Sequence, residues 1–307
     1  MTPPPAEPTA AFRRVAVLGT GLIGGSFGLA LRRLLPTARI VGWDKEEVLR
    51  QAEARGAIHE GCADLRRAVA DADLIYVALP IGVTLALLSE IARQAGPRAL
   101  VTDACSTKAV VCRTAAGHFR DGAVFLGGHP IAGKETRGIA QADAELFRGT
   151  KYVLIGESRE PSAPGSDASE PRAMRDARVA GFVALVEALG AHPVWLDAET
   201  HDWAVAIISH LPQMVAVALA NVVHEETDET GLPVTLAGSG LRDALRVAGS
   251  PYALWRDIAL TNRENIGRAL DRVAMAIEDL RVRLASRELE EQFDAANELY
   301  KLLRELK

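Results

Sequence analysis

The sequence predicts an α/β protein, with an N-terminal Rossmann-type doubly wound parallel sheet followed by a C-terminal all-helical domain. Two observations predict it. Short β-branched runs alternate with helical stretches from Arg14 to about Asp197, and from there to the end of the chain only helical spacing remains. We therefore expect a disordered tail at residues 1–12, an α/β domain at 13–197 and a helical domain at 198–307.

Most of the predicted strands are unbroken apolar runs, as expected where helices cover both faces of a parallel sheet. A stretch rich in Ser, Pro, Glu and Asp at 157–176 predicts a surface excursion, followed by a helix at about 177–189. The predicted strands are Val15–Leu18, Ile40–Trp43, Leu74–Ala78, Leu100–Thr102, Val124–Leu126, Tyr152–Ile155 and Pro193–Leu196.

The first helix of the second domain is expected at about 198–223 and is apolar on most sides. Pro212 lies inside it and predicts a kink. A helix that is apolar all round is a buried one. Because a domain this small offers little interior, we expect a homodimer formed through the helical domain.

Composition excludes several classes of protein. The net charge of −5, without a long basic run, argues against binding nucleic acid or an anionic membrane surface. Cys62, Cys105 and Cys112 form no CxxC pair, so neither a disulfide framework nor a metal site is expected. The start has no signal-peptide core, and the apolar stretches Trp203–Ile208 and Met214–Ala220 are far shorter than the ~20 residues that cross a bilayer. We predict a cytoplasmic protein that acts on a small molecule.

The first predicted strand runs directly into GTGLIG at 19–24. This GxGxxG spacing gives a tight turn, close approach of backbone to a pyrophosphate, and a helix N-terminus that attracts phosphate. The second strand ends at Asp44, twenty residues past the third glycine, where a carboxylate accepts from ribose hydroxyls and repels a 2′-phosphate. Asp44 could instead be a solvated strand end, and Lys45 and Arg50 could soften the preference. We predict NAD, held by Gly19, Gly21, Leu22, Ile23, Gly24 and Asp44.

Ligands of open parallel sheets bind beyond the carboxyl ends of the strands. The third strand leads into Leu79 and Pro80, and the fourth into Asp103, which we place beside the cofactor. Just beyond lie Ser106 and, after the fifth strand, His129. A neutral histidine suits the task of taking a hydroxyl proton during hydride transfer, so both are candidate catalytic residues. His129 could alternatively cap a loop, and Ser106 a helix.

Five stretches of the chain resemble the prephenate and arogenate dehydrogenase family, over nearly its whole length from about Arg14. They are GTGLIGGS at 19–26, TDACSTK at 102–108, GHPIAGKE at 128–135, SHLPQ at 209–213 and LRDALRVAGSPYALWRDI at 241–258. The resemblance implies a nucleotide-binding domain, a helical dimerisation domain that also binds substrate, and an active site between them. It also implies NAD-dependent oxidative decarboxylation of prephenate or arogenate, in tyrosine biosynthesis.

The resemblance further implies roles for individual residues. His129 would hydrogen-bond the ring hydroxyl with help from Ser106, and Arg246 would hold a substrate carboxylate. Asp202 would pair with Arg246. The remaining substrate contacts implied are Trp255 near the mouth of the pocket, Glu135 at its entry, and Lys134, Ser209, His210 and Gln213. Structural alternatives remain: Arg246 as a solvated helix charge, Asp202 as a first-turn helix acid and Trp255 as core.

The chain departs from the family's pattern at Gln213, where many prephenate-specific members carry His. We therefore favour a cyclohexadienyl dehydrogenase that acts on both substrates, with an arogenate-specific enzyme as the alternative. More remote is a 3-hydroxyacid dehydrogenase, whose members use a lysine on the linking helix, although residues 198–223 contain none. A non-catalytic NAD(H) sensor would need only the fold, and would not need His129 and Ser106.

Overall fold

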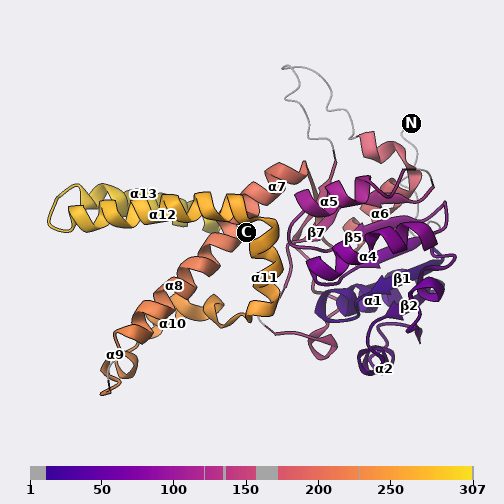
Figure 1. Cartoon of the computed structure of the whole chain (residues 1–307), viewed down its shortest axis with the longest axis horizontal. Coiled ribbons are helices and arrows are strands. Elements are labelled where there is room, and N and C mark those ends of the chain that lie inside the picture. Colours follow the sequence, from indigo (N-terminus) through magenta and orange to yellow (C-terminus); the bar gives the residue numbers. More distant parts are fainter. Residues whose placement is uncertain (1–11, 121, 134–135, 157–171, 228, 306–307) are drawn as a thin grey trace. The chain divides into compact units, whose positions relative to one another are not determined.

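The computed structural model describes residues 12–120, 122–133, 136–156, 172–227 and 229–305 (Figure 1). The chain divides into two compact units. The first, here the α/β unit, runs to Val205 and also contains Gly249–Asn262. The second, the helical unit, comprises Ala206–Ala248 and Arg263–Lys307. The α/β unit therefore extends beyond the boundary predicted at residue 197 and takes in a segment that we had assigned to the helical domain.

The main sheet has six strands in the order β3-β2-β1-β4-β5-β6, and all of its pairs are parallel. The order reverses between β1 and β4, which is where doubly wound sheets bind nucleotides. β3 was not predicted, because two residues are too few to show a pattern. The strands are β1 (Arg14–Leu18), β2 (Arg39–Trp43), β3 (Glu60–Gly61), β4 (Leu74–Val77), β5 (Leu100–Asp103) and β6 (Val124–Leu126).

Helices cover both faces of this sheet. Successive residues of β1 point to opposite faces: Val17 packs in one core with Phe27, and Leu18 in the other with Ile91. Phe27 also stacks on Tyr76 of β4, with ring centroids 3.8 Å apart. The helices are α1 (Leu22–Leu34), α2 (Glu46–Ala54), α3 (Leu65–Val69), α4 (Ile81–Gln94), α5 (Ala109–Ala116) and α6 (Ala177–Ala188).

A second sheet corrects the expectation of a single parallel one. It has the order β7-β8-β9, with β7 (Gly128–Pro130) antiparallel to β8 (Lys151–Ile155) and β8 parallel to β9 (His192–Leu196). β7 was not predicted, because Gly-His-Pro contains no β-branched side chain. His129 therefore lies within a strand, opposite Val153, rather than in a loop after one.

A continuous helical run links the two units. It consists of α7 (Ala198–Val205), a π-helical turn (Ala206–His210) and α8 (Leu211–Glu225). The kink predicted at Pro212 falls next to this π-helical turn. Pro212 is the second residue of α8 and has no N–H to donate to the helical turn before it, which is where the π turn lies. The remaining helices are α9 (Leu232–Thr235), α10 (Ser239–Leu245), α11 (Tyr252–Thr261), α12 (Arg263–Arg283) and α13 (Leu289–Glu305).

Two sequence expectations need correction. Phe12, which was placed in the disordered tail, is buried in the core of the α/β unit. The rest of that predicted tail, residues 1–11, and residues 157–171 of the predicted excursion lie outside the described residues. The run Ala198–Glu225, at 28 residues and a mean hydropathy of 1.7, is long and apolar enough to span a membrane, whereas we had counted only its shorter uninterrupted stretches. The same run buries polar side chains, which lipid penalises: His201, Asp202, His210 and Gln213.

Candidate functional site

In the glycine turn after β1, the first and third glycines are closely packed and the second is open. A Cβ on Gly19, which has φ +87°, would lie 2.4 Å from the Ala78 carbonyl oxygen, and one on Gly24 would lie 1.9 Å from the Gly19 oxygen. A Cβ on Gly21 would meet nothing within 4 Å. The first and third glycines are thus needed for packing, while the second leaves backbone accessible at the start of α1. This cradle fits a dinucleotide phosphate.

Asp44, at the end of β2, is fixed beside this turn. Its Oδ2 accepts hydrogen bonds from the Thr20 N–H at 2.7 Å and from the Thr20 hydroxyl at 3.3 Å. Its Oδ1 accepts from the Lys45 N–H at 2.7 Å. A carboxylate has about four lone-pair sites, so Asp44 can still accept from another donor. Its contact with ribose stays a prediction.

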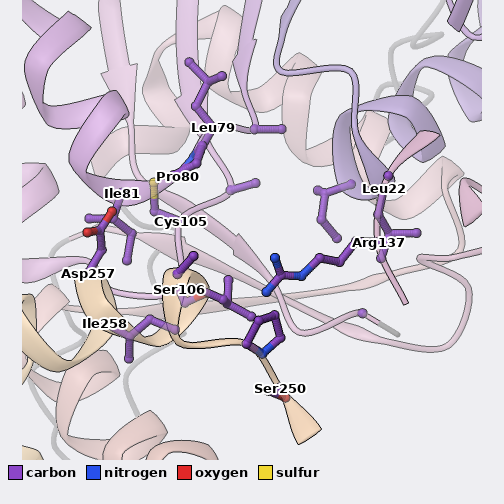
Figure 2. A pocket seen from close by; sticks show the side chains of 18 of the residues that line it. Leu22, Leu79, Pro80, Ile81, Cys105, Ser106, Arg137, Ser250, Asp257 and Ile258 are labelled. Atoms are coloured by element: carbon purple, nitrogen blue, oxygen red, sulfur yellow. Dashed lines mark hydrogen bonds between the residues drawn. The ribbon is translucent and has the colours of Figure 1, made fainter. Parts of the chain in front are cut away.

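A cavity of about 470 Å³ lies within the α/β unit, against the turn (Figure 2). Five of the predicted site residues line it: Leu22, Ile23, Leu79, Pro80 and Ser106. Arg137 also lines it and points its guanidinium inward. Among the described lining residues Arg137 is the only cation, and sequence analysis missed it because an arginine in a loop carries no pattern.

The segment from Ser250 to Ile258 forms part of the cavity wall. It is held by Asp257 of α11, which accepts from the Gly82 N–H at 2.8 Å, at the start of α4. That hydrogen bond, aided by Arg256, lowers the pKa of the Asp257 carboxyl. Asp257 was also missed, since its partner is 175 positions away in the sequence.

Asp103, for which a cofactor contact is predicted, is buried and makes several polar contacts. Its carboxylate forms an ion pair with Lys108 Nζ, and both side chains are fully buried. It also accepts from the N–H groups of Cys105 and Gly128, at 2.9 and 3.1 Å, while Lys108 donates to the Gly128 carbonyl at 2.8 Å. Burial alone would lower the pKa of Lys108, but the adjacent Asp103 carboxylate outweighs it and the pKa is raised.

This buried ion pair ties together the two segments that carry the candidate catalytic residues. Ser106 lies between Asp103 and Lys108 in the chain, and His129 follows Gly128 directly. Ser106 lines the cavity; the half-buried His129 is not among the lining residues. The His129 ring is instead located by His201 of α7, whose Nε2 lies 2.9 Å from His129 Nδ1.

Asp202 is buried beside His201. Its carboxylate accepts from the Lys108 N–H at 2.6 Å and the Ala109 N–H at 2.9 Å, at the N-terminus of α5, and it contacts His201 Nδ1 at 2.8 Å. The partner predicted for Asp202, Arg246, belongs to the helical unit, and their pairing stays a prediction. In the sequence, the only local sign of this cluster is the His-Asp pair at 201–202.

The other predicted substrate residues fall into three groups. In the helical unit, Ser209 and Arg246 are exposed, whereas His210 and Gln213 are buried. Trp255 is half-buried in α11 of the α/β unit. Lys134 and Glu135 lie outside the described residues.

Within the described part of the chain, no cluster of three His, Cys, Asp or Glu side chains could hold a metal ion.

A glycine cradle at the switch point of a doubly wound sheet, with an acidic residue after β2, defines the class of nucleotide-dependent dehydrogenases. Comparison with known families is more specific. Residues 27–164 match the model of the prephenate dehydrogenase nucleotide-binding domain, and residues 197–305 match that of the prephenate dehydrogenase dimerization domain. The chain belongs to the prephenate dehydrogenase family.

Individual relatives of the chain support this family assignment. The prephenate dehydrogenase of Lactococcus lactis is 34% identical over 274 residues, which is 86% of this chain and 71% of that protein. The cyclohexadienyl dehydrogenase of Zymomonas mobilis is 29% identical over 90% of each. Among solved structures, prephenate dehydrogenase from Aquifex aeolicus, in complex with hydroxyphenyl propionate and NAD+, is 26% identical with a TM-score of 0.82, covering 95% of this chain and 98% of that one. Synechocystis arogenate dehydrogenase is 29% identical with a TM-score of 0.76, covering 94% and 99%.

These findings confirm the fold class, the family and the dehydrogenase class predicted from the sequence. They do not favour the 3-hydroxyacid dehydrogenase or the non-catalytic sensor.

Proposed function

We propose that this protein oxidises and decarboxylates prephenate, arogenate or both, with NAD+ as the acceptor. The observation that carries the proposal is that one α/β unit contains the glycine cradle, Asp44, and His129 tied by a buried ion pair to the Ser106 segment. The names of the relatives, which include prephenate, cyclohexadienyl and arogenate dehydrogenases, support the substrate class.

The cofactor would lie along the cradle and the cavity. Leu22, Ile23, Leu79 and Pro80 would contact it, the Gly19–Gly24 turn would receive its phosphates, and Asp44 would accept from its ribose. Arg137 supplies a positive charge that suits an anionic group in the same cavity. When bound, NAD+ accepts a hydride from the ring carbon that carries the hydroxyl.

The protein's own residues position the substrate and move a proton. His129 receives the proton of the ring hydroxyl, with Ser106 as a nearby hydrogen-bonding partner. Arg246 binds a substrate carboxylate, because its planar guanidinium matches that group. The ring carboxylate then leaves as carbon dioxide, and aromatisation makes that loss easy. We further propose that Gln213, a neutral amide, accommodates either side chain.

The helical unit, we propose, forms a homodimer, and the protein is cytoplasmic. Many large apolar side chains in this unit are exposed in the single chain, among them Leu236, Val282 and Leu284 at 71–73%. The family model matching 197–305 is that of a dimerization domain, so a second copy is the occupant we assign to these surfaces. Sedimentation equilibrium should show a dimer at micromolar concentrations, and Leu284→Glu should weaken it. A monomer throughout, or flotation with lipid vesicles, would contradict this.

The function is tested by following NADH formation with prephenate and with arogenate side by side, using purified protein and His129→Asn as the inactive control. We expect NADH and carbon dioxide in equal amounts from at least one substrate. Turnover of both would support the cyclohexadienyl assignment. Absence of NADH with both substrates would refute the proposed function.

A further inference from the structure

A chain of three polar side chains runs inward from His129. His129 Nδ1 lies 2.9 Å from His201 Nε2, and His201 Nδ1 lies 2.8 Å from Asp202 Oδ1. The two rings meet nearly edge to face, with centroids 5.1 Å apart and an angle of 74° between their planes. His201 and Asp202 are 1% and 2% exposed, whereas His129 is half-buried. The outer member is therefore the proposed base, and the innermost is a buried carboxylate.

Backbone donors and a side-chain amide hold Asp202 in place. Its two carboxylate oxygens accept from the Lys108 and Ala109 N–H groups at the start of α5, where the helix dipole also stabilises negative charge. Its backbone carbonyl accepts from the Asn262 side-chain amide at 2.7 Å, which fixes the residue from the other side. An ionised carboxylate only accepts hydrogen bonds, so the neighbouring histidine must donate to it.

This requirement fixes the tautomers of both histidines. His201 carries its proton on Nδ1, facing Asp202, which leaves a lone pair on Nε2 when the ring is neutral. His129 must then carry its proton on Nδ1, to donate to that lone pair. The lone pair of neutral His129 is thereby placed on Nε2. A neutral histidine in water prefers the opposite arrangement, with its proton on Nε2.

We infer that His201 and Asp202 are positioning residues that hold His129 in the tautomer with a basic Nε2. The inference rests on the function proposed above. In the reaction, the substrate O–H bond breaks and an Nε2–H bond forms on His129. The O–H electron pair becomes the second bond of the carbonyl, while the hydride passes to NAD+. The proton stays on His129, and Asp202 offsets the new imidazolium charge through His201.

Two substitutions of His201 separate positioning from mere packing. In His201→Gln the amide can still donate to Asp202 and accept from His129, so we expect kcat within a few-fold of the wild type. In His201→Leu both hydrogen bonds are lost, and we expect kcat to fall about 10- to 100-fold. This is less than the loss expected on removing the general base itself, because His129 remains. KM and the dissociation constant of NAD+ should change little in either variant. As a matched control, His59→Leu removes a histidine that accepts from the Ile40 N–H, and should leave kcat unchanged.

The tautomer can be read without turnover. Nitrogen-15 NMR of labelled histidines in the resting protein, assigned with the His129→Asn and His201→Gln variants, should show both rings protonated on Nδ1. His129 protonated on Nε2, or equal kcat values for His201→Leu and the wild type, would overturn the inference. If His201→Leu does not fold, the wild-type spectrum and the His201→Gln kinetics still decide. A protein inactive with both substrates refutes the proposed function, yet leaves the spectrum to test the hydrogen-bonded chain.

Discussion

The two units of the molecule treat apolar side chains in opposite ways. In the α/β unit, strand residues such as Leu74 and Val77 are completely buried within one chain. In the helical unit, Met275 and Leu303 remain more than 60% exposed, although α8 packs against both α10 and α12. The α/β unit thus buries its own apolar core, while the helical unit leaves large apolar side chains exposed in the single chain. Proton transfer should therefore depend on the first unit, and substrate capture also on the second.

The largest expected effect tests the first half of that comparison. In His129→Asn the side chain remains polar but can no longer take a proton, so kcat should fall about 10²–10⁴-fold. The dissociation constant of NAD+, measured by fluorescence, and the oligomeric state should match those of the wild type. Near-normal turnover would reduce His129 to a structural residue and remove the proposed chemistry from the α/β unit.

A residue of the helical unit should act on binding rather than on chemistry. The proposed contact of Arg246 with a carboxylate exists in both ground and transition states, so Arg246→Ala should mainly raise KM. Loss of a charge-assisted hydrogen bond costs roughly 1.5–3 kcal/mol, or about ten- to a hundred-fold in KM. Arg242→Ala, one turn earlier in the sequence, is the control. A collapsed kcat with unchanged KM would place Arg246 in the chemical step instead.

The third prediction concerns cofactor choice within the α/β unit. Replacing Asp44 by Ser removes the charge that repels a 2′-phosphate, so the ratio of kcat/KM for NAD to that for NADP should fall roughly tenfold. Because Asp44 also accepts from the Thr20 N–H, the variant should lose some NAD affinity as well. A wild-type enzyme with the higher kcat/KM for NADP would refute the assignment.

Local patterns allowed much of the α/β unit to be predicted. The β1 strand, the glycine turn and Asp44 lie within 31 consecutive residues of 14–44, where each element has its own sequence signal. His129 could be proposed because it follows two glycines after a strand. The contacts that complete the site could not be predicted, because they join distant segments: His129 with His201 across 72 positions, and Gly82 with Asp257 across 175. Tertiary packing alone brings such pairs together.

The smallest expected effect is on the pH dependence of the free energy of unfolding, which tests how tightly the α/β unit is packed. The α/β unit buries acidic groups in their neutral form: burial raises the pKa of Cys105 above its ordinary 9.0, and those of Tyr76 and Tyr152 above 10.0. Burial also raises the pKa of Cys112 to about 12. Above pH 9 the unfolded chain releases these protons while the folded unit retains them. The free energy of unfolding should therefore fall as pH rises, by about 1.4 kcal/mol per pH unit for each such group.

The measurement is the free energy of unfolding of the whole protein at pH 7, 8, 9 and 10, from urea titrations followed by tryptophan fluorescence and by circular dichroism. Between pH 7 and 8 the four groups are protonated in both states, so they contribute no slope there. Above pH 9 the cysteines contribute first and the tyrosines later. Cys105→Ala removes one of the two thiols with a raised pKa. The free energy of unfolding should then fall less steeply between pH 9 and 10, by about 1.4 kcal/mol per pH unit. An equal slope in variant and wild type would show that Cys105 does not keep its proton in the folded α/β unit, and that this unit is less tightly closed than its buried side chains indicate.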